Sequence, residues 1–253
     1  MLAAAVASAQ DTGALRELLA RHVRPGRIGA VDLNVVDYSQ LRGDPLYAKA
    51  IDELAATDPD GLPADSDRFA FWINAYNLLA IKTVVDHYPI ASIRDAGSFF
   101  SPVWKKPAGV VGGKSYSLDD IEHGILRPRF KDPRAHFAIV CASVSCPDLR
   151  AEPYEGARLS AQLDDAARAF LANPSKGLVV DAAANTVTAS SIFRWFGEDF
   201  ATGGGVIAFV RVKAAPPLAA RVAGFGDGDL AWMSYDWSLN DAVRAQQDSV
   251  RER

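Results

Sequence analysis

Basic charge is scarce in this sequence. Its 27 lysines and arginines are outnumbered by 31 aspartates and glutamates among 253 residues, so the net charge is −4. Domains that bind nucleic acids usually carry an excess of basic residues on one face, and this balance argues against a nucleic-acid partner. The sequence also lacks any apolar run near the ~20 residues that a transmembrane helix needs, so we predict no membrane span.

Cysteine is scarce as well. The chain has only two cysteines, and one pair is compatible with a reducing or an oxidising compartment. The N-terminal residues favour export, because residues 2–6 are apolar and Ala7-Ser8-Ala9 has the small-x-small form of a signal-peptidase site. We interpret residues 1–10 as the remnant of a signal peptide, with a frayed alanine-rich helix as the alternative. This predicts a periplasmic or secreted protein, and otherwise a cytoplasmic one.

The spacing of apolar residues predicts mainly helices, with strands only in short hairpins. Helices are expected over residues 11–23, 45–54, 65–87, 117–127, 159–172 and 206–212, and hairpins around Gly112-Gly113 and Ala184-Asn185. No linker interrupts the pattern. We therefore predict one α+β domain over residues 11–240, with helices packed on a small, mainly antiparallel sheet, followed by a polar and mobile tail over 241–253.

The longest predicted helix, 65–87, contains polar side chains within an apolar pattern. Asn74 and Asn77 are three residues apart and share one face of this helix. Buried amides need hydrogen-bond partners. They either satisfy nearby backbone groups or line a substrate groove, and on the second interpretation Asn74, Asn77 and the adjacent Trp72 are substrate-binding residues.

A second predicted helix with polar residues covers residues 117–127. Pro128 is expected to end this helix. Asp119, His123 and Arg127 are spaced four residues apart and therefore share a polar face. Glu122 precedes the histidine directly. His123 is a candidate general base that Glu122 or Asp119 orients, and the alternative is a solvated surface histidine.

Both cysteines lie in one short segment. The strand-like run 136–141 ends in Cys141, and a tight polar turn over 142–147 follows, with Ser143, Ser145 and Cys146 in it. A thiol at the end of a rigid strand, at the mouth of a loop, is well placed to act as a nucleophile. Ser143 and Ser145 are candidate substrate-binding residues. His136 is expected to point to the opposite face of this strand from Cys141.

Five motifs in this order resemble those of bacterial members of family 547 of the domains of unknown function. They are residues 71–77 (FWINAYN), 120–126 (DIEHGIL), 136–147 with both cysteines, 195–200 and 235–240. The resemblance covers roughly residues 31–240. It implies no activity, because the family has no assigned function, and it implies export, because bacterial members are often exported. Plant members often carry serine or aspartate in place of Cys141 and Cys146.

Two functional hypotheses follow. The first is a thiol-dependent hydrolase or acyl transferase acting on peptide-like substrates, with Cys141 as nucleophile, His123 as base and Glu122 as the orienting carboxylate. A papain-like or transglutaminase-like fold is the corresponding structural hypothesis, although those families place the cysteine before the histidine and this chain has the reverse order. No cofactor is expected. A metal site of Cys141, Cys146 and His123 is disfavoured because no second ligand pair follows.

The second hypothesis is a non-catalytic binding module for a peptide or glycan in the cell envelope. Six aromatic residues are candidates for its pocket, namely Trp72, Phe99, Phe100, Trp104, Trp195 and Trp237. In that case the two cysteines are structural, and an exported chain would join them in a disulfide. Either hypothesis expects a small-molecule or peptide ligand as the partner.

Overall fold

One long buried helix organises the fold. The computed structural model describes residues 12–251, so the expected signal-peptide remnant lies outside the described residues. Helix α4 (Asp65–His87) begins with Asp65 and Asp67 in its first turn, where negative charge is favourable, and it ends just before Tyr88 and Pro89. From Phe69 to Val85 every residue except Lys82 is buried. Neighbouring elements therefore cover α4 on nearly all sides, unlike a surface helix, which buries one apolar face.

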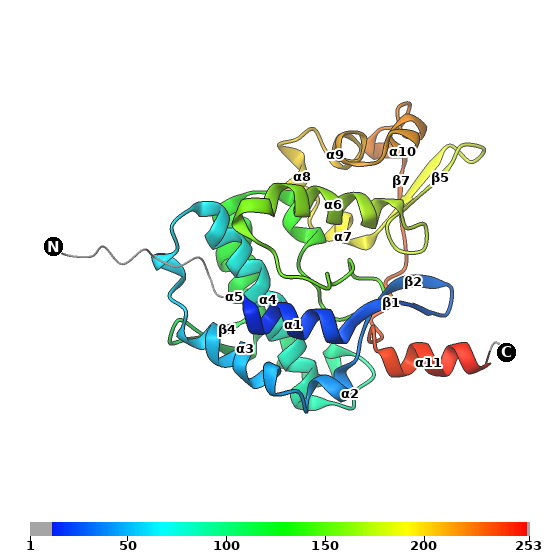
Figure 1. The fold of residues 1–253 in the computed structure, drawn as a ribbon. Helices are drawn as coiled ribbons and strands as arrows, with labels where there is room; N and C mark the ends of the chain where they lie inside the picture. Colours follow the sequence, from blue (N-terminus) through cyan, green and yellow to red (C-terminus); the bar gives the residue numbers. More distant parts are fainter. Residues whose placement is uncertain (1–11, 252–253) are drawn as a thin grey trace.

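The other helices pack around α4 in two groups, which Figure 1 shows on opposite sides of it. On one side lie α1 (Gly13–His22), α2 (Tyr38–Leu41) and α3 (Pro45–Ala56). On the other side lie α6 (Leu159–Ala172), α7 (Ser191–Trp195), α8 (Gly197–Ala201), α9 (Val206–Lys213) and α10 (Pro216–Arg221). Short 3₁₀ turns connect these elements, among them η2 (Ile93–Ala96), η3 (Val103–Lys105) and η5 (Pro133–Phe137).

The strands of the described residues form three small sheets, so the predicted α+β class is confirmed. Both expected hairpins are present, one formed by β3 (Pro107–Val111) and β4 (Lys114–Ser117), the other by β5 (Leu178–Asp181) and β6 (Thr186–Ala189). Strand β7 (Leu230–Trp232) joins β6 in parallel. A further hairpin of β1 (Val23–Ile28) and β2 (Val31–Val36) was not predicted, because Pro25 and Gly26 are also typical of the end of a helix.

The described residues form two large hydrophobic cores and a small third cluster of Ile28, Leu33, Val35, Val144 and Ala242. The larger core surrounds α4 and includes the side chains of α1, α3 and α5 (Leu118–Ile121). The second core lies between α6, the sheet of β5, β6 and β7, and α7 to α9, with Phe137 at its centre among the rings of Phe170, Phe193 and Phe209. Tyr235 packs against both cores. The boundary between them is where the candidate site lies.

Two local predictions are wrong. Residues 136–141 do not form a strand, since residues 133–137 are the 3₁₀ turn η5 and residues 138–141 are irregular. The side chain of Asn77 takes the place of a neighbouring strand, because its amide donates to the carbonyl of Ala138 and accepts from the N–H of Val140. Pro128 does not end its helix either. The chain continues through it as the π-helix η4 (Glu122–Phe130), whose wider turn accommodates a residue without an N–H.

The segment over 236–241 runs between parts of the chain that are distant in sequence. The N–H of Val36 donates to the carbonyl of Asn240, whose own N–H donates to Ala142. The hydroxyl of Tyr38 donates to the side chain of Asn240 at 2.8 Å. Beyond it, α11 (Ala242–Arg251) packs on β1 and β2, so most of the expected polar tail is a helix. No helix in the described residues 12–251 is long and apolar enough to cross a membrane.

The Asn77 bonds give a first prediction. Asn77→Ala leaves two buried backbone groups without partners, so we expect a loss of roughly 2–4 kcal/mol in the free energy of unfolding, measured by urea denaturation. The exposed residue Gln247 on α11 provides the control, since Gln247→Ala should change stability by less than ~0.5 kcal/mol. Equal stability of the two variants would show that the Asn77 bonds contribute little.

Candidate functional site

A cavity of about 190 Å³ lies at the boundary of the two cores. We call it the Glu122 cavity. Its wall includes Tyr76 of α4, Asp119 of α5, Glu122 and His123 of η4, and His136 of η5. The remaining lining residues are mostly aromatic or apolar. They come from η3, α5, α7 and its C-cap, and the two loops over 139–147 and 235–237; they are Trp104, Leu118, Ile139, Cys141, Cys146, Pro147, Ile192, Trp195, Phe196, Tyr235 and Trp237.

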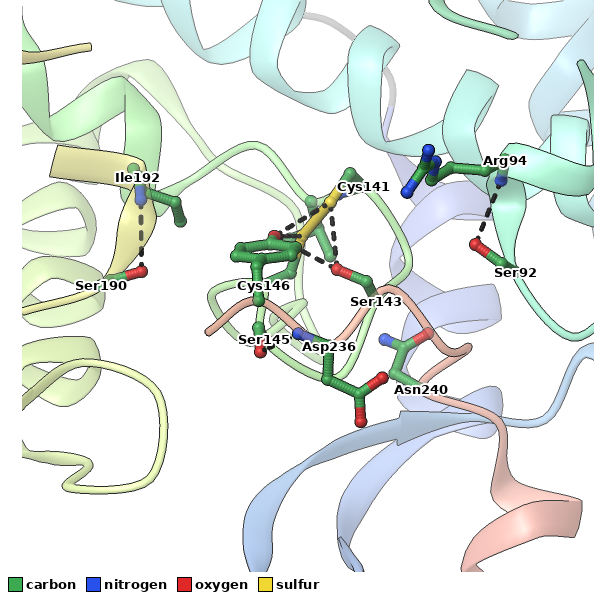
Figure 2. Close-up of a disulfide and its surroundings, with 12 residues drawn as sticks. Ser92, Arg94, Cys141, Ser143, Ser145, Cys146, Ser190, Ile192, Asp236 and Asn240 are labelled. Atoms are coloured by element: carbon green, nitrogen blue, oxygen red, sulfur yellow. Dashed lines mark hydrogen bonds between the residues drawn. A yellow bond between two sulfur atoms is a disulfide. The ribbon is translucent and has the colours of Figure 1, made fainter. Parts of the chain in front are cut away.

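A disulfide between Cys141 and Cys146 forms one part of this wall (Figure 2). Their Cα atoms are 6.3 Å apart, and the turn between them holds Ala142 at a φ of 58°, a conformation that few side chains adopt. The hydroxyl of Tyr235 donates to Cys146 Sγ at 3.1 Å and lies 3.3 Å from Cys141 Sγ. In this state Cys141 has no thiolate, so the nucleophile of the thiol hypothesis is capped.

His123 lies at the rim of the cavity with 42% of its side chain exposed. Its Nδ1 is 2.8 Å from Nη1 of Arg127, and its Nε2 is 3.9 Å from Asp119. The predicted polar face of Asp119, His123 and Arg127 is therefore confirmed. Because a guanidinium can only donate, Nδ1 of His123 accepts this bond. Within residues 12–251 no hydrogen bond joins His123 to Cys141, and their catalytic pairing stays a prediction.

Glu122 is a buried carboxyl group without a cationic partner. Its side chain is 14% exposed. The Tyr76 hydroxyl donates to it weakly at 3.4 Å, and Nδ1 of His136 is 3.9 Å away. No lysine or arginine of the described chain is within ion-pair distance of it. Burial therefore raises the pKa of Glu122 to about 7, although the charge of Arg127 opposes the shift. At neutral pH this carboxyl group can both give and take a proton.

His136 lies beside Glu122 and is more deeply buried, at 4% exposed. Burial lowers its pKa to about 4, so the imidazole is neutral at pH 7. Nε2 is 2.7 Å from Asp199, and the ring stacks on Phe196 at 4.1 Å. A neutral imidazole that donates from Nε2 has its lone pair on Nδ1, which is the nitrogen nearer Glu122. This tautomer turns a hydrogen-bond acceptor towards Glu122, which is compatible with a protonated carboxyl group there.

Asp199 of α8 anchors the other side of His136. Arg127 binds it through two hydrogen bonds, from Nε at 2.6 Å and from Nη2 at 2.9 Å. Burial alone would raise the pKa of Asp199, but the bonds from Arg127 and His136 lower it on balance. The two carboxyl groups that flank His136 therefore differ in protonation, which is the arrangement expected where one of them acts as an acid.

The predicted substrate-binding residues of α4 do not line the Glu122 cavity. The amide of Asn74 donates to the carbonyl of Tyr154 at 2.8 Å and accepts from its N–H at 2.9 Å. Asn77 binds the backbone of residues 138 and 140 in the same way. Trp72 is buried and packs edge-on against Tyr116 at 5.2 Å. Both asparagines thus follow the first of the two interpretations, in which they satisfy backbone groups.

The two predicted serines lie in the disulfide loop but do not line the cavity. Ser143 is buried, and its hydroxyl lies 3.2 Å from Cys141 Sγ and donates to Tyr235. Ser145 is also buried, and its hydroxyl accepts from the N–H of Asp236 at 2.9 Å. Both stabilise the loop. Of the six aromatic candidates for a pocket, Trp104, Trp195 and Trp237 do line the Glu122 cavity.

His136 and Asp199 were not predicted as site residues. His136 was expected on a strand, facing away from Cys141, and Asp199 had no predicted role, although the motif over 195–200 contains it. The available signal was that this motif places two adjacent acidic residues, Glu198 and Asp199, among aromatic ones. Among the residues that the structure describes, no cluster of three or more histidine, cysteine or acidic side chains is arranged to hold a metal ion.

Comparison with known proteins agrees with the resemblance of the motifs. Residues 59–171 match the family described as "Protein of unknown function, DUF547". The match includes Glu122, His123, His136 and the disulfide loop, while Asp199 and Tyr235 lie beyond it. No curated protein matches the chain. No solved structure matches it either.

The opposite pKa shifts of Glu122 and His136 give a second prediction. The raised pKa of Glu122 means that the folded state loses stability as the pH rises from about 4.5 to about 7. The lowered pKa of His136 means that stability is lost as the pH falls from about 6.5 to about 4. Each effect amounts to roughly 2–3 kcal/mol, and the two oppose one another over much of this range.

Single substitutions should separate the two effects. Relative to the unchanged protein, Glu122→Gln should gain stability as the pH rises from 4.5 to 7, and His136→Asn should gain stability as the pH falls from 6.5 to 4. Urea unfolding at a series of pH values measures both differences. If the two difference curves ran in parallel, Glu122 and His136 would not have the opposite shifts described above.

Proposed function

We propose that the Glu122 cavity is the active site of a hydrolase or transferase, in which Glu122 acts as the general acid and base. The observation that supports this most directly is the environment of its carboxyl group: buried, without a cation, and open to a cavity. A pKa near the working pH is what efficient proton transfer requires. Structural carboxylates in protein interiors are usually paired, as Asp199 is with Arg127.

The chemistry divides among three side chains. Protonated Glu122 gives its proton to the leaving atom of the substrate as the bond to that atom breaks. The Tyr76 hydroxyl then donates to the carboxylate that forms. A water molecule or an acceptor hydroxyl attacks the other part of the substrate and returns a proton to Glu122, which restores the starting state. His136, held by Asp199, fixes the position of Glu122 and excludes water from its inner side.

The aromatic side chains of the cavity supply the binding surface. Trp195 is 46% exposed and lies nearly parallel to Trp237 at 5.7 Å, and Tyr235 packs on both. Exposed aromatic clusters of this kind mark binding sites. The ligand is a segment of a peptide or glycan. The disulfide persists in an oxidising compartment, which supports a place in the periplasm or outside the cell.

A second candidate function is supported by the surroundings of Cys141. If a thiol reductant opens the disulfide, the hydroxyls of Ser143 and Tyr235, which lie 3.2 and 3.3 Å from its sulfur, can donate to a thiolate. That would favour a thiol-dependent hydrolase or acyl transferase acting on peptide-like substrates, with Cys141 as nucleophile and His123 as base. This function would exist only in the reduced protein.

Two variants distinguish these functions. Release of new amines or reducing ends from peptide and glycan polymers should be measured with and without a thiol reductant. We expect Glu122→Gln to lower kcat by roughly 100-fold or more, and Cys141→Ser to retain most of the activity. The rate should fall as the pH rises above about 7, because Glu122 then loses the proton that it donates. Glu17→Gln, at an exposed position on α1, is the control.

Each other outcome has a defined meaning. Activity that appears only with reductant and disappears in Cys141→Ser would establish the thiol mechanism and remove Glu122 from its role. Binding without turnover in all variants would show a non-catalytic binding module.

A further inference from the structure

A second cavity of about 760 Å³ lies beside the Glu122 cavity. We call it the Arg94 cavity. It is lined by Arg94 and Asp95 of η2, by Phe99 and Val103, by Asp236 and Trp237, and by several small residues of the same loops. Trp104 and Trp237 line both cavities. The centres of their rings are 5.9 Å apart. These two side chains, rather than main chain, separate the cavities.

The two cavities meet at the side chains of Trp104 and Trp237. In Figure 2 the disulfide lies between Ile192, which lines the Glu122 cavity, and Arg94, which lines the second one. The guanidinium of Arg94 is 5.3 Å from the centre of the Trp237 ring, and Trp237 in turn stacks on Trp195. A row of flat side chains therefore leads from one cavity to the other.

We infer that the two cavities are subsites of one groove, and that the groove binds an uncharged linear oligosaccharide. This rests on the proposed function of the Glu122 cavity and names the substrate class for it. One sugar ring would lie against Trp195 beside Glu122, and the following rings would pass Trp104 and Trp237 towards Arg94 and Phe99.

The hydrogen-bonding groups of the Arg94 cavity suit hydroxyl groups. Asp95 uses Oδ2 to accept from the N–H groups of Ala91 and Ser92, and Asp236 uses Oδ1 to accept from Ser238. Within the described chain the other oxygen of each carboxylate has no hydrogen-bond donor, so it can accept from a ligand. Arg94 forms no ion pair within residues 12–251, and its N–H groups can donate to a ring or hydroxyl oxygen.

The charge of the groove disfavours an anionic ligand. Four carboxyl groups line the two cavities, those of Asp95, Asp119, Glu122 and Asp236, while Arg94 is the one arginine or lysine in either lining. This excess of acidic groups disfavours a polyanionic chain. Sugar hydroxyls, in contrast, donate to carboxylates, and the C–H faces of sugar rings pack on aromatic side chains.

The backbone around the groove disfavours an extended peptide. Peptides in extended form usually add a strand to an exposed sheet edge, where main-chain hydrogen bonds supply affinity. None of the residues that line either cavity belongs to a strand of the described structure. The walls are built from side chains of helices, turns and loops.

The test measures binding through tryptophan fluorescence, because Trp104, Trp195 and Trp237 all lie in the groove. The probes are two neutral series, cellobiose with cellohexaose and chitobiose with chitohexaose, and the peptide tetralysine. We expect the hexamer of at least one series to bind about tenfold or more tightly than its dimer, since only the hexamer reaches both cavities.

Adjacent phenylalanines provide matched variants. Phe99 and Phe100 are 93% and 94% exposed, but only Phe99 lines the Arg94 cavity. Phe99→Ala should weaken binding of the hexamer roughly fivefold or more and leave binding of the dimer unchanged. Phe100→Ala should change neither affinity. Trp195→Ala should weaken binding of both the dimer and the hexamer. Because the side chains of Phe99 and Phe100 are exposed, neither variant should disturb folding, and thermal unfolding verifies this.

The failure of this inference differs from a failure of the proposed function. Equal affinity for dimer and hexamer, unaffected by Phe99→Ala, would overturn the extended groove and leave the Glu122 cavity as a binding site. Binding of tetralysine but of neither sugar series would overturn the choice of an oligosaccharide, and so would no binding of any probe. The role of Glu122 in proton transfer is tested separately, because fluorescence reads binding without turnover.

Discussion

Irregular backbone in the interior of a protein must find hydrogen-bond partners, and helix α4 provides them here. Asn74 and Asn77 extend from the buried helix and bind the main chain of residues 138, 140 and 154 as a neighbouring strand would. This lets the loop that carries the disulfide cross the interior without belonging to a sheet. The loop in turn forms one wall of the Glu122 cavity. The site therefore depends on two amides that do not touch it.

The same interior sets the electrostatics of the site. Glu122, His136 and Asp199 lie in a row, and only Asp199 has an arginine partner. Desolvation disfavours charge on the other two, so one becomes a proton donor at neutral pH and the other a neutral hydrogen-bonding group. A lysine or arginine beside Glu122 would turn the row into an ordinary ion pair. Because the described surroundings contain no such residue, the pKa of Glu122 stays near 7 and the group can transfer a proton.

The sequence predicted the features that depend on local pattern. Apolar spacing located most helices, two hairpins followed from their turn residues, and the four-residue spacing of Asp119, His123 and Arg127 placed them on one face. The role of the asparagines was also foreseen as one of two alternatives, since amides in so apolar a helix need partners.

Features that depend on distant contacts could not be predicted in this way. His136 faces the cavity because Asn77 holds the following residues out of a strand, and no local pattern near His136 records that contact. Asp199 becomes part of the site through its contacts with His136 and Arg127, which are both more than sixty residues away in the sequence. The hairpin of β1 and β2 could not be predicted from Pro25, because proline is tolerated both in an edge strand and at a helix end.

The path of residues 236–241 has a consequence for the order in which the molecule assembles. This segment supplies hydrogen bonds to Val36 near the start of the domain, to Ala91 after α4, and to both Ala142 and Val144 in the disulfide loop. During synthesis, all of these groups emerge long before their partners do. The disulfide loop can therefore reach its final conformation only when nearly the whole chain has been made. Closure of the last segment then completes the wall of the cavity.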